Sequence, residues 1–298
     1  MPSFELLQVD AFTNTPLGGN PCAVVMEADS LSEKEMLMIA KEMNLSETAF
    51  TVSSENADFG ARYFTPAGEI PFAGHPTVAT IIALETAGFL EMPSGAGSRE
   101  ISLELSVGNI PILLERDKNQ KLRVTMTQNT PEFLRTYRAE DVMPCLSLSK
   151  EDVVEDVPLQ TVSTGTPQLM VPLRSHRALR LATPDLPSFA KLVKQSDFSS
   201  IHLFCMGGMT PRGTTAARHF SPPPEVLEDP FTGSATGSMA AYLWHYELID
   251  NPVFLAEQGH WLSRPGEAVV EILGDPKNIE GIKVGGGGIT VFRGQLTL

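Results

Sequence analysis

Cationic residues are scarce in this sequence. Its 298 residues include 22 Lys and Arg against 36 Asp and Glu, which gives a formal net charge of -14 at pH 7. Because a phosphate backbone is bound by clustered Lys and Arg, the composition argues against a nucleic-acid partner. The same balance gives an anionic substrate no long-range attraction, so we expect any bound acid to be held by local dipoles and a few cations.

Cysteine is also rare, and no hydrophobic run approaches the length of a membrane span. Cys22, Cys145 and Cys205 have no CxxC spacing, which indicates neither a disulfide framework nor a zinc site. We expect all three to pack as small apolar side chains. The first residues contain no basic segment followed by an apolar run, which predicts a soluble, cytoplasmic protein without a membrane partner.

What the sequence does contain is one motif twice. The first copy is Arg62-Tyr63-Phe64-Thr65-Pro66, followed by Gly74 and an apolar run of small residues. The second is Arg218-His219-Phe220-Ser221-Pro222, followed by Gly233 and a similar run after a slightly longer loop. Each copy is typical of a strand, a turn and a helix. Two copies of one unit in a chain of this length predict two similar domains.

The same order of strands and helices is predicted before both copies. The expected strands are 6–12, 22–25 and one that forms within 44–52, with Glu47 at its junction with the preceding helix, in the first half, and 159–164, 169–173 and 201–206 in the second, with helices over 31–43 and 189–193. Residues 130–155 have the least pattern, so we place the N-terminal domain at 1–128 and the C-terminal domain at 129–287. A glycine run from Gly285, which we expect to be flexible, leads into a final strand, 288–298, that is a candidate to complete the first domain.

Several of these motifs together resemble the PhzF (phenazine-biosynthesis-like) family. The resemblance spans nearly the whole chain, and its motifs are Asp10-Ala11-Phe12-Thr13, Gly19-Asn20-Pro21, Asn44-Leu45-Ser46-Glu47-Thr48, Arg62-Tyr63-Phe64-Thr65-Pro66, Gly74-His75-Pro76-Thr77 and Glu228-Asp229-Pro230-Phe231-Thr232-Gly233-Ser234-Ala235. It implies an α+β fold of the diaminopimelate-epimerase type. In that fold two similar domains each roll a mixed β-sheet or barrel around a central helix, and the active site lies in the cleft between them.

The resemblance also implies a cofactor-independent isomerase with no metal, commonly a homodimer. Such an enzyme moves a proton within a small unsaturated or α-acidic carboxylic acid, which is the small-molecule partner we expect. In the family's phenazine-pathway member the reaction is isomerisation of a dihydro-hydroxyanthranilate, and the Glu of the NLSET motif moves the proton. On this sequence that residue is Glu47, assisted by His75, Asp229 and Ser234. An alternative is a small-acid binding or interaction protein of the same fold without catalysis.

One departure narrows the chemistry. Related epimerases and racemases of this fold place a cysteine at the start of each central helix, whereas this sequence has Ala73 and Thr232 there. A racemase that uses two thiols is therefore not expected.

Each proposed catalytic residue also has an ordinary explanation. Glu47 could be a solvated acid, although its apolar neighbours would bury it and raise its pKa toward the range of a general acid or base. His75 could cap the following helix, or a neutral imidazole there could donate to a substrate oxygen. Asp229 could simply stabilise a helix dipole, or act as a second carboxylate that keeps one of a pair protonated.

The expected substrate-binding residues are small. Ser234 is an ordinary helix-cap residue, but its hydroxyl and the backbone N–H groups of Gly233 and Ala235 could also hold a carboxylate. Gly74 would do the same from the other domain, and Asn20 completes the set. The two motif arginines, Arg62 and Arg218, are expected to form structural ion pairs.

Overall fold

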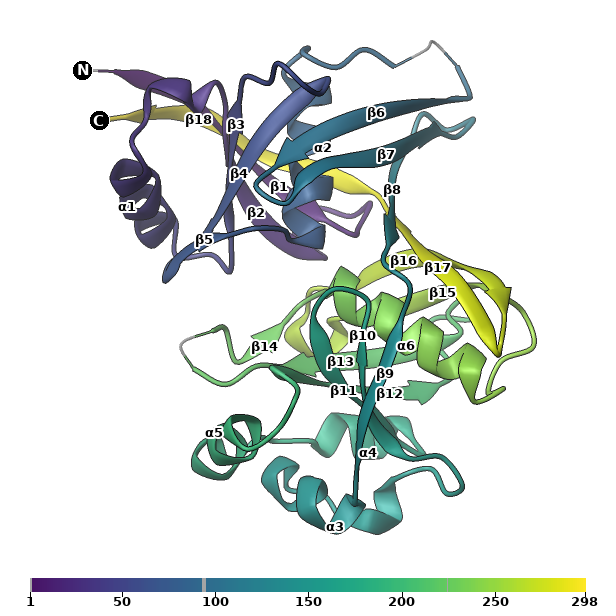
Figure 1. Cartoon of the computed structure of the whole chain (residues 1–298). Coiled ribbons are helices and arrows are strands. Elements are labelled where there is room, and N and C mark those ends of the chain that lie inside the picture. The colour runs from purple at the N-terminus through teal and green to yellow at the C-terminus, as the bar shows by residue number, and fades with distance from the viewer. Residues whose placement is uncertain (1, 93–94, 224) are drawn as a thin grey trace. The chain divides into compact units, whose positions relative to one another are not determined.

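A mixed sheet wrapped around one buried helix occurs in each of two units of the chain (Figure 1). The computed structural model describes residues 2–92, 95–223 and 225–298. Unit 1 comprises Met1–Met126 and Gly285–Leu298, and unit 2 comprises Thr127–Val284.

Unit 1 is built mainly from antiparallel pairs. Its strands are β1 (Ser3–Ala11), β2 (Asn20–Val25), β3 (Thr48–Val52), β4 (Phe59–Thr65), β5 (Gly68–Ile70), β6 (Gly97–Leu105), β7 (Gly108–Arg116), β8 (Leu122–Gln128) and β18 (Gly288–Thr297), and its helices are α1 (Glu33–Met43) and α2 (Gly74–Thr86). The pairs β2–β3 and β4–β6 are parallel. The last strand, β18, pairs with β1 along its whole length, from Thr297 opposite Ser3 to Gly288 opposite Ala11.

Unit 2 repeats this plan with additional short helices. Its strands are β9 (Glu132–Tyr137), β10 (Leu159–Ser163), β11 (Pro167–Pro172), β12 (Ser200–Met206), β13 (Thr215–Phe220), β14 (Glu228–Asp229), β15 (Val253–Gln258), β16 (Gly266–Asp275) and β17 (Asn278–Gly286). Its α-helices are α3 (Ala139–Val142), α4 (His176–Leu181), α5 (Leu186–Lys194) and α6 (Gly233–His245). Among the described residues, 3₁₀ turns lie at Ala28–Ser30 in unit 1 and at Met143–Leu146, Lys150–Asp152 and His260–Leu262 in unit 2.

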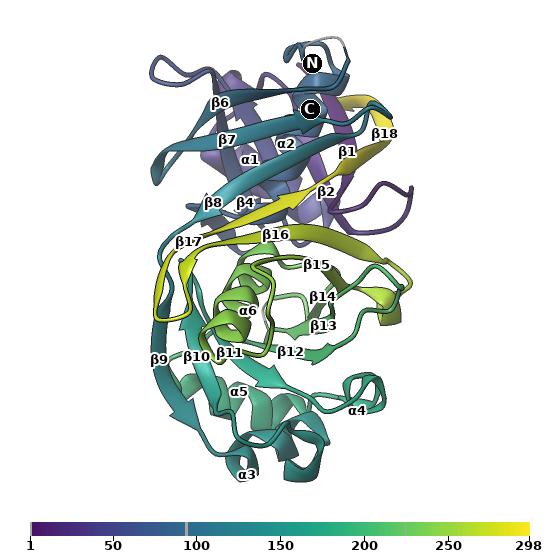
Figure 2. The ribbon, with the colours of Figure 1, turned by 90° about the vertical axis from the view of Figure 1, so that its right-hand side faces the viewer.

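The central helices α2 and α6 are buried on nearly every side. Helix α2 packs against β1, β2, β3 and β18, and α6 against β10, β11 and β16. Figure 2 shows α6 inside its ring of strands. Small residues permit this close packing: a Cβ on Gly237 of α6 would lie 1.9 Å from the Oε1 atom of Gln128. A helix that is apolar all round is expected to be buried in this way.

Strand register shows that the two units are copies of one plan. The parallel pair β2–β3 places Ala23 opposite Thr48, and the parallel pair β11–β12 places Leu169 opposite Ile201. The following antiparallel pairs place Ala49 opposite Tyr63 in unit 1 and His202 opposite His219 in unit 2. These registers give a residue-by-residue correspondence between the units.

The motif arginines make the same ion pair in both units. Arg62 donates two hydrogen bonds to Glu69, at 2.8 and 2.6 Å, and Arg218 donates two to Glu228, both at 2.7 Å. Arg218 also donates to backbone carbonyls, including that of Ala182 at 2.8 Å. The prediction that these arginines are structural is therefore confirmed.

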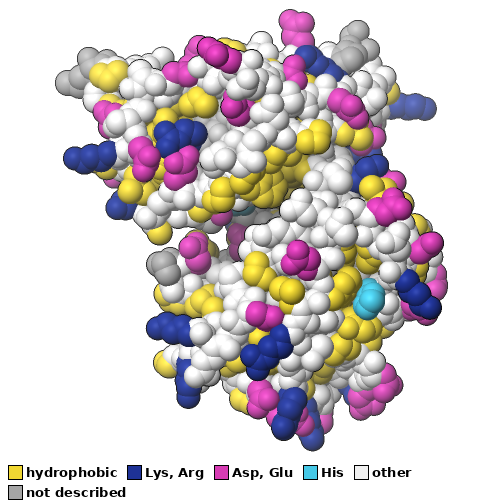
Figure 3. Space-filling view, in the orientation of Figure 1, with side chains coloured by type: hydrophobic (Ala, Val, Ile, Leu, Met, Phe, Trp, Pro, Cys, Tyr) yellow, Lys and Arg dark blue, Asp and Glu magenta, His cyan; other side chains and the backbone are white. Residues whose placement is uncertain are grey.

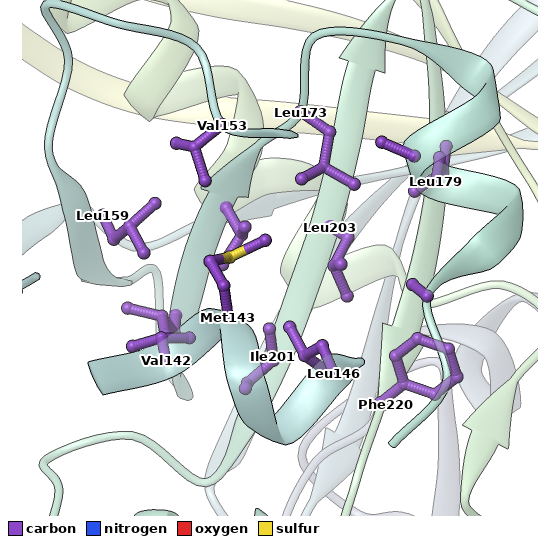
Figure 4. Close-up of a cluster of buried hydrophobic side chains, with 14 of the residues drawn as sticks. Val142, Met143, Leu146, Val153, Leu159, Leu173, Leu179, Ile201, Leu203 and Phe220 are labelled. Carbon is purple, nitrogen blue, oxygen red and sulfur yellow. The ribbon is translucent and has the colours of Figure 1, made fainter. Parts of the chain in front are cut away.

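Each unit has its own apolar core. In unit 1 one cluster packs α1 against the sheet through residues such as Met36, Ile39 and Phe50. In unit 2 a larger cluster packs the short helices of the 139–194 segment against β11, β12 and β13 (Figure 4). The sequence pattern missed α3 and α4, because helices of four and six residues have too few turns to display a period, and it also missed the strands β9, β15, β16 and β17.

The glycine run before the last strand is closely packed, so the expectation of a flexible linker is wrong. Gly285 and Gly286 end β17, and Gly288 begins β18. A Cβ on Gly286 would lie 2.2 Å from a ring carbon of Phe12, and one on Gly288 would lie 2.8 Å from Ile82. Glycine is used here because buried side chains approach the backbone too closely for any other residue.

Charged side chains of both signs are mixed over the visible face of each unit, and Lys and Arg do not gather there (Figure 3). Over the residues that the structure describes, no helix has the length and apolar content required to cross a bilayer.

Candidate active site

Three predicted residues of unit 1 lie together, and we call them the unit-1 cluster: Asn20, Glu47 and His75. Asn20 is the first residue of β2, Glu47 directly precedes β3, and His75 is the second residue of α2. The parallel pairing of β2 with β3 brings the beginnings of both strands to the same edge of the sheet. Their side chains therefore meet at the start of the buried helix.

Two contacts in the unit-1 cluster define how the imidazole is held. The His75 Nε2 atom lies 3.3 Å from Oε2 of Glu47, and the Asn20 Nδ2 atom lies 3.1 Å from Nδ1 of His75. Since an amide nitrogen only donates, Nδ1 must accept, and a neutral ring then carries its hydrogen on Nε2, facing Glu47. The His75 side chain is 6% exposed and that of Glu47 is 19% exposed. The carboxylate thus has a fixed neighbour and still reaches solvent.

The beginning of α2 has no side-chain cap. Its N-cap residue is Ala73, and the first hydrogen bond of the helix runs from the amide of Thr77 to the carbonyl of Ala73. His75 lies inside the helix, so its interpretation as a helix cap is wrong. The amides of Gly74 and His75 precede the first intrahelical bond, as expected for a helix start that can face an anion.

The unit-2 cluster is the corresponding group at the start of α6: Asp229, Gly233, Ser234 and Ala235. The N-cap of α6 is Thr232, again without a side-chain cap. The Thr232 hydroxyl donates to the Asp229 carboxylate, and Gln258 donates from Nε2 to the Asp229 carbonyl at 2.7 Å. Asp229 is thereby fixed beside the helix start, where its charge also complements the helix dipole.

Ser234 is the second residue of α6, so it is not the cap residue that its sequence context suggested. Its Oγ accepts a hydrogen bond from Nε2 of Gln168 at 2.9 Å. Gln128 contacts the same helix turn: it donates from Nε2 to the Gly233 carbonyl at 2.8 Å, and its Oε1 accepts from the hydroxyl of Thr164 at 2.6 Å. The first turn of α6 is therefore held by side-chain amides of β8 and β11, of which Gln168 is buried and Gln128 is partly exposed.

Sequence reasoning missed these supporting amides. Gln168 had a visible signal, because it is a polar residue at the beginning of an apolar strand, directly after Gly165-Thr166-Pro167, the counterpart of Gly19-Asn20-Pro21. Gln128 had no such signal, since it ends a strand in which polar and apolar residues alternate.

All three cysteines are unpaired and buried, as expected from the sequence. Cys22 lies behind the unit-1 cluster, where burial and then the charge of Glu47 raise the pKa of its thiol far above the usual value. Burial also raises the pKa of Cys145 to about 11 and that of Cys205 to about 12. The residues at the two helix N-caps, Ala73 and Thr232, carry no thiol.

Thiol alkylation should therefore leave the native protein unmodified. Because the thiolate is the reactive form and all three thiols are buried with raised pKa values, we expect no iodoacetamide adduct by intact-mass analysis at pH 8, and three adducts in denaturant. A rapid single adduct on the native protein would contradict this expectation.

Among the residues described, no three His, Cys, Asp or Glu side chains are grouped so that they could hold a metal ion.

Comparison with known proteins gives a consistent result. A family model described as phenazine biosynthesis-like protein, PhzC-PhzF, matches residues 9–294. The uncharacterized isomerase YfhB of Bacillus subtilis is 35% identical over 274 residues, which cover 91% of this chain and 92% of that protein. The trans-2,3-dihydro-3-hydroxyanthranilate isomerase of Pseudomonas fluorescens is 33% identical over 293 residues, which cover 97% of this chain and 98% of that protein.

Solved structures show the same fold. A PhzF-family phenazine biosynthesis protein of Bacillus anthracis has a TM-score of 0.91 at 31% identity, with 100% of both chains covered. A hydroxyproline epimerase from Agrobacterium vitis, at 13% identity, has a TM-score of 0.68 and covers 99% of this chain and 91% of its own. The second likeness concerns the fold alone. Together they confirm the predicted α+β fold of the diaminopimelate-epimerase type.

Proposed function

Because this chain belongs to the PhzC-PhzF family of phenazine biosynthesis-like proteins and is an isomerase, we propose that it moves a proton within a small unsaturated or α-acidic carboxylic acid, with Glu47 as the general acid and base. The observation that carries the proposal is the unit-1 cluster. A carboxylate at 19% exposure lies 3.3 Å from an imidazole whose other nitrogen accepts a hydrogen bond from Asn20.

In the proposed reaction Glu47 removes a proton from a carbon of the substrate. The electron pair of the broken C–H bond moves into the adjacent unsaturated or carboxyl system, and the protonated Glu47 returns the proton at another carbon. The reaction is an internal redox-neutral shift and needs no oxidant or reductant. The His75 Nε2 atom lies 3.3 Å from Oε2 of Glu47, and its N–H can stabilise charge on a substrate oxygen as the C–H bond breaks.

The remaining predicted residues are assigned to substrate binding. Gly233, Ser234 and Ala235 would hold a carboxylate with their backbone N–H groups and the serine hydroxyl, and Gly74 would contribute an amide of α2. Asp229 is assigned the second carboxylate role in proton transfer. Preorganised donors of this kind are worth roughly 2.7–4 kcal/mol each where charge develops. The lack of a side-chain cap at both helix starts supports this assignment.

Solvent exchange tests the proposal directly. The probe is trans-2,3-dihydro-3-hydroxyanthranilate, the compound in the name of the Pseudomonas fluorescens relative, followed by a panel of small unsaturated carboxylic acids. Incubated in D₂O with the protein and followed by NMR and mass spectrometry, a substrate should isomerise or take up one deuterium on carbon. Tight binding of such acids with no exchange and no product would contradict the proposal and favour a binding protein without catalysis.

A further inference from the structure

Gln168 is a buried amide with only half of its hydrogen-bonding capacity used. It is the second residue of β11 and is 2% exposed. Its Nε2 donates to the Ser234 Oγ at 2.9 Å, while its buried Oε1 has no hydrogen-bond partner among the residues that the structure describes. An unsatisfied buried polar atom costs about 1–3 kcal/mol. Stability alone would therefore favour an apolar side chain of the same size here.

The bond from Gln168 determines what the Ser234 hydroxyl can do. A hydroxyl has one hydrogen to donate and lone pairs to accept with. Since the Gln168 N–H occupies a lone pair of Oγ, the hydrogen of Ser234 must point to another acceptor. Ser234 is in the first turn of α6, where an acid would be bound. The hydroxyl is thus held as a donor.

Unit 1 contains the same arrangement. There Asn20 Nδ2 lies 3.1 Å from His75 Nδ1, and His75 is, like Ser234, the second residue of the central helix. By strand register Gln168 corresponds to Cys22, two residues after Asn20. Residues two apart in a strand point to the same face. Both units therefore place an amide on the same face of the equivalent strand, and each amide donates to the second residue of its helix.

We propose that Gln168 is a positioning residue that fixes the Ser234 hydroxyl as a hydrogen-bond donor to the carboxylate of the substrate. This inference rests on the proposed function and assigns Gln168 no contact with the reacting atoms.

The test separates binding from stability. Four proteins are compared: wild type, Q168L, S234A and Q168L/S234A. The binding probe is 2-aminobenzoate, a stable carboxylate, measured by titration calorimetry, and turnover of trans-2,3-dihydro-3-hydroxyanthranilate is measured in parallel. We expect Q168L to weaken 2-aminobenzoate binding about tenfold and to raise KM, while its melting temperature stays equal to or above that of the wild type. In the double variant the loss should be no larger than in S234A, because Gln168 acts through Ser234.

Two further variants sharpen the result. Q168N keeps the amide but shortens its reach, and it provides a folded alternative should Q168L be unstable; it should lose affinity as Q168L does. Q160L is the matched control, because Gln160 lies in β10 with both amide groups bonded, to the Leu134 carbonyl and the Tyr246 hydroxyl. Q160L should lower the melting temperature and leave the affinity for 2-aminobenzoate unchanged.

Several outcomes overturn the inference. One is wild-type affinity for 2-aminobenzoate in Q168L and Q168N while the affinity of S234A is reduced. A second is a loss of affinity in the double variant that equals the sum of the losses in Q168L and S234A. A third is a wild-type protein that neither binds 2-aminobenzoate nor turns over trans-2,3-dihydro-3-hydroxyanthranilate. If S234A and Q168L both bind normally while turnover still depends on Glu47, the inference fails and the proposed proton transfer stands. If turnover is absent but binding depends on Gln168 and Ser234 as described, the proposed chemistry fails and the positioning role stands.

Discussion

Replacement of Glu47 by glutamine should reduce kcat by about 10²–10⁴-fold while the affinity for 2-aminobenzoate changes by less than about threefold. Glutamine has the same shape as glutamate, so its amide can occupy the position in which the glutamate oxygen lies 3.3 Å from Nε2 of His75. It cannot accept and return a proton. The loss should therefore appear in kcat and in deuterium uptake rather than in binding, as expected for an interaction needed only in the transition state.

E42Q is the control for this change. Glu42 is an exposed acid of α1 in the same unit, so the variant removes one negative charge without touching the unit-1 cluster. It should show wild-type turnover and exchange. Turnover by E47Q within a few-fold of the wild type would contradict the assignment of Glu47. So would a proportional loss of turnover and of 2-aminobenzoate binding, because that pattern indicates a role in holding the ligand.

The residues of the unit-1 cluster were proposed from motifs that resemble the PhzF family, and each of them lies at the boundary of a strand or helix. Asn20 begins a strand after a glycine turn, Glu47 precedes another, and His75 stands beside Pro76 at a helix start. Such positions are marked by turn and helix-start residues that are visible in sequence. The detail that sequence could not supply is which atom bonds to which. The direction of the Asn20 amide toward Nδ1 defines the tautomer of His75, and this depends on tertiary packing.

In the fold, too, some features could be predicted from the sequence and others depend on tertiary packing. Central strands and helices were predicted because the motif is repeated and each copy has a clear period. Helix α1 begins after Ser32, which forms a capping box with Glu35. The glycine run at 285–288 was misinterpreted because a sequence does not show why a glycine is needed. It can be needed for backbone conformational freedom, or because a neighbouring side chain packs where a Cβ would lie. That distinction depends on Phe12, which is distant in the chain and lies against Gly286.

A buried histidine pair should make the protein sensitive to mild acid. His202 and His219 face each other across β12 and β13, with their Nδ1 atoms 3.3 Å apart, and they are 0% and 4% exposed. Burial, and then the neighbouring His219, lower the pKa of His202 well below its usual value, and burial lowers the pKa of His219 to about 3. At 3.3 Å one ring nitrogen donates and the other accepts, so the accepting ring must be neutral, and burial disfavours a charge on either ring.

The sign of the pH effect follows from these lowered pKa values. In the unfolded chain both histidines titrate near pH 6.5, so below that pH the unfolded state binds more protons than the folded state. The contribution of the two neutral histidines to the free energy of unfolding is therefore fully present above about pH 7. It declines as the pH falls, until the histidines become protonated in the folded protein as well. Below the unfolded pKa of about 6.5, each histidine lowers the free energy of unfolding by about 1.4 kcal/mol per pH unit. The two histidines together should therefore remove about 4 kcal/mol between pH 7 and pH 5.

Unit 1 supplies the replacement that tests this effect. At the equivalent register positions it has Ala49 and Tyr63, a buried pair without a group that titrates near neutral pH. The hydroxyl of Tyr63 lies 3.0 Å from Oγ1 of Thr77, a helix threonine whose counterpart in α6 is Thr236. The double variant H202A/H219Y transfers this pair to unit 2. We expect its free energy of unfolding, measured with urea at pH 7 and pH 5, to fall by about 4 kcal/mol less than that of the wild type.

Comparing the change between two pH values, rather than stability at one, makes the test independent of packing defects. A defect introduced by the new side chains lowers stability equally at both pH values and cancels in the difference. Acidic groups elsewhere in the chain also cancel, because they are present in both proteins. An equal loss of stability in the wild type and in H202A/H219Y would show that the buried pair is protonated in the folded protein, which its burial and mutual contact argue against.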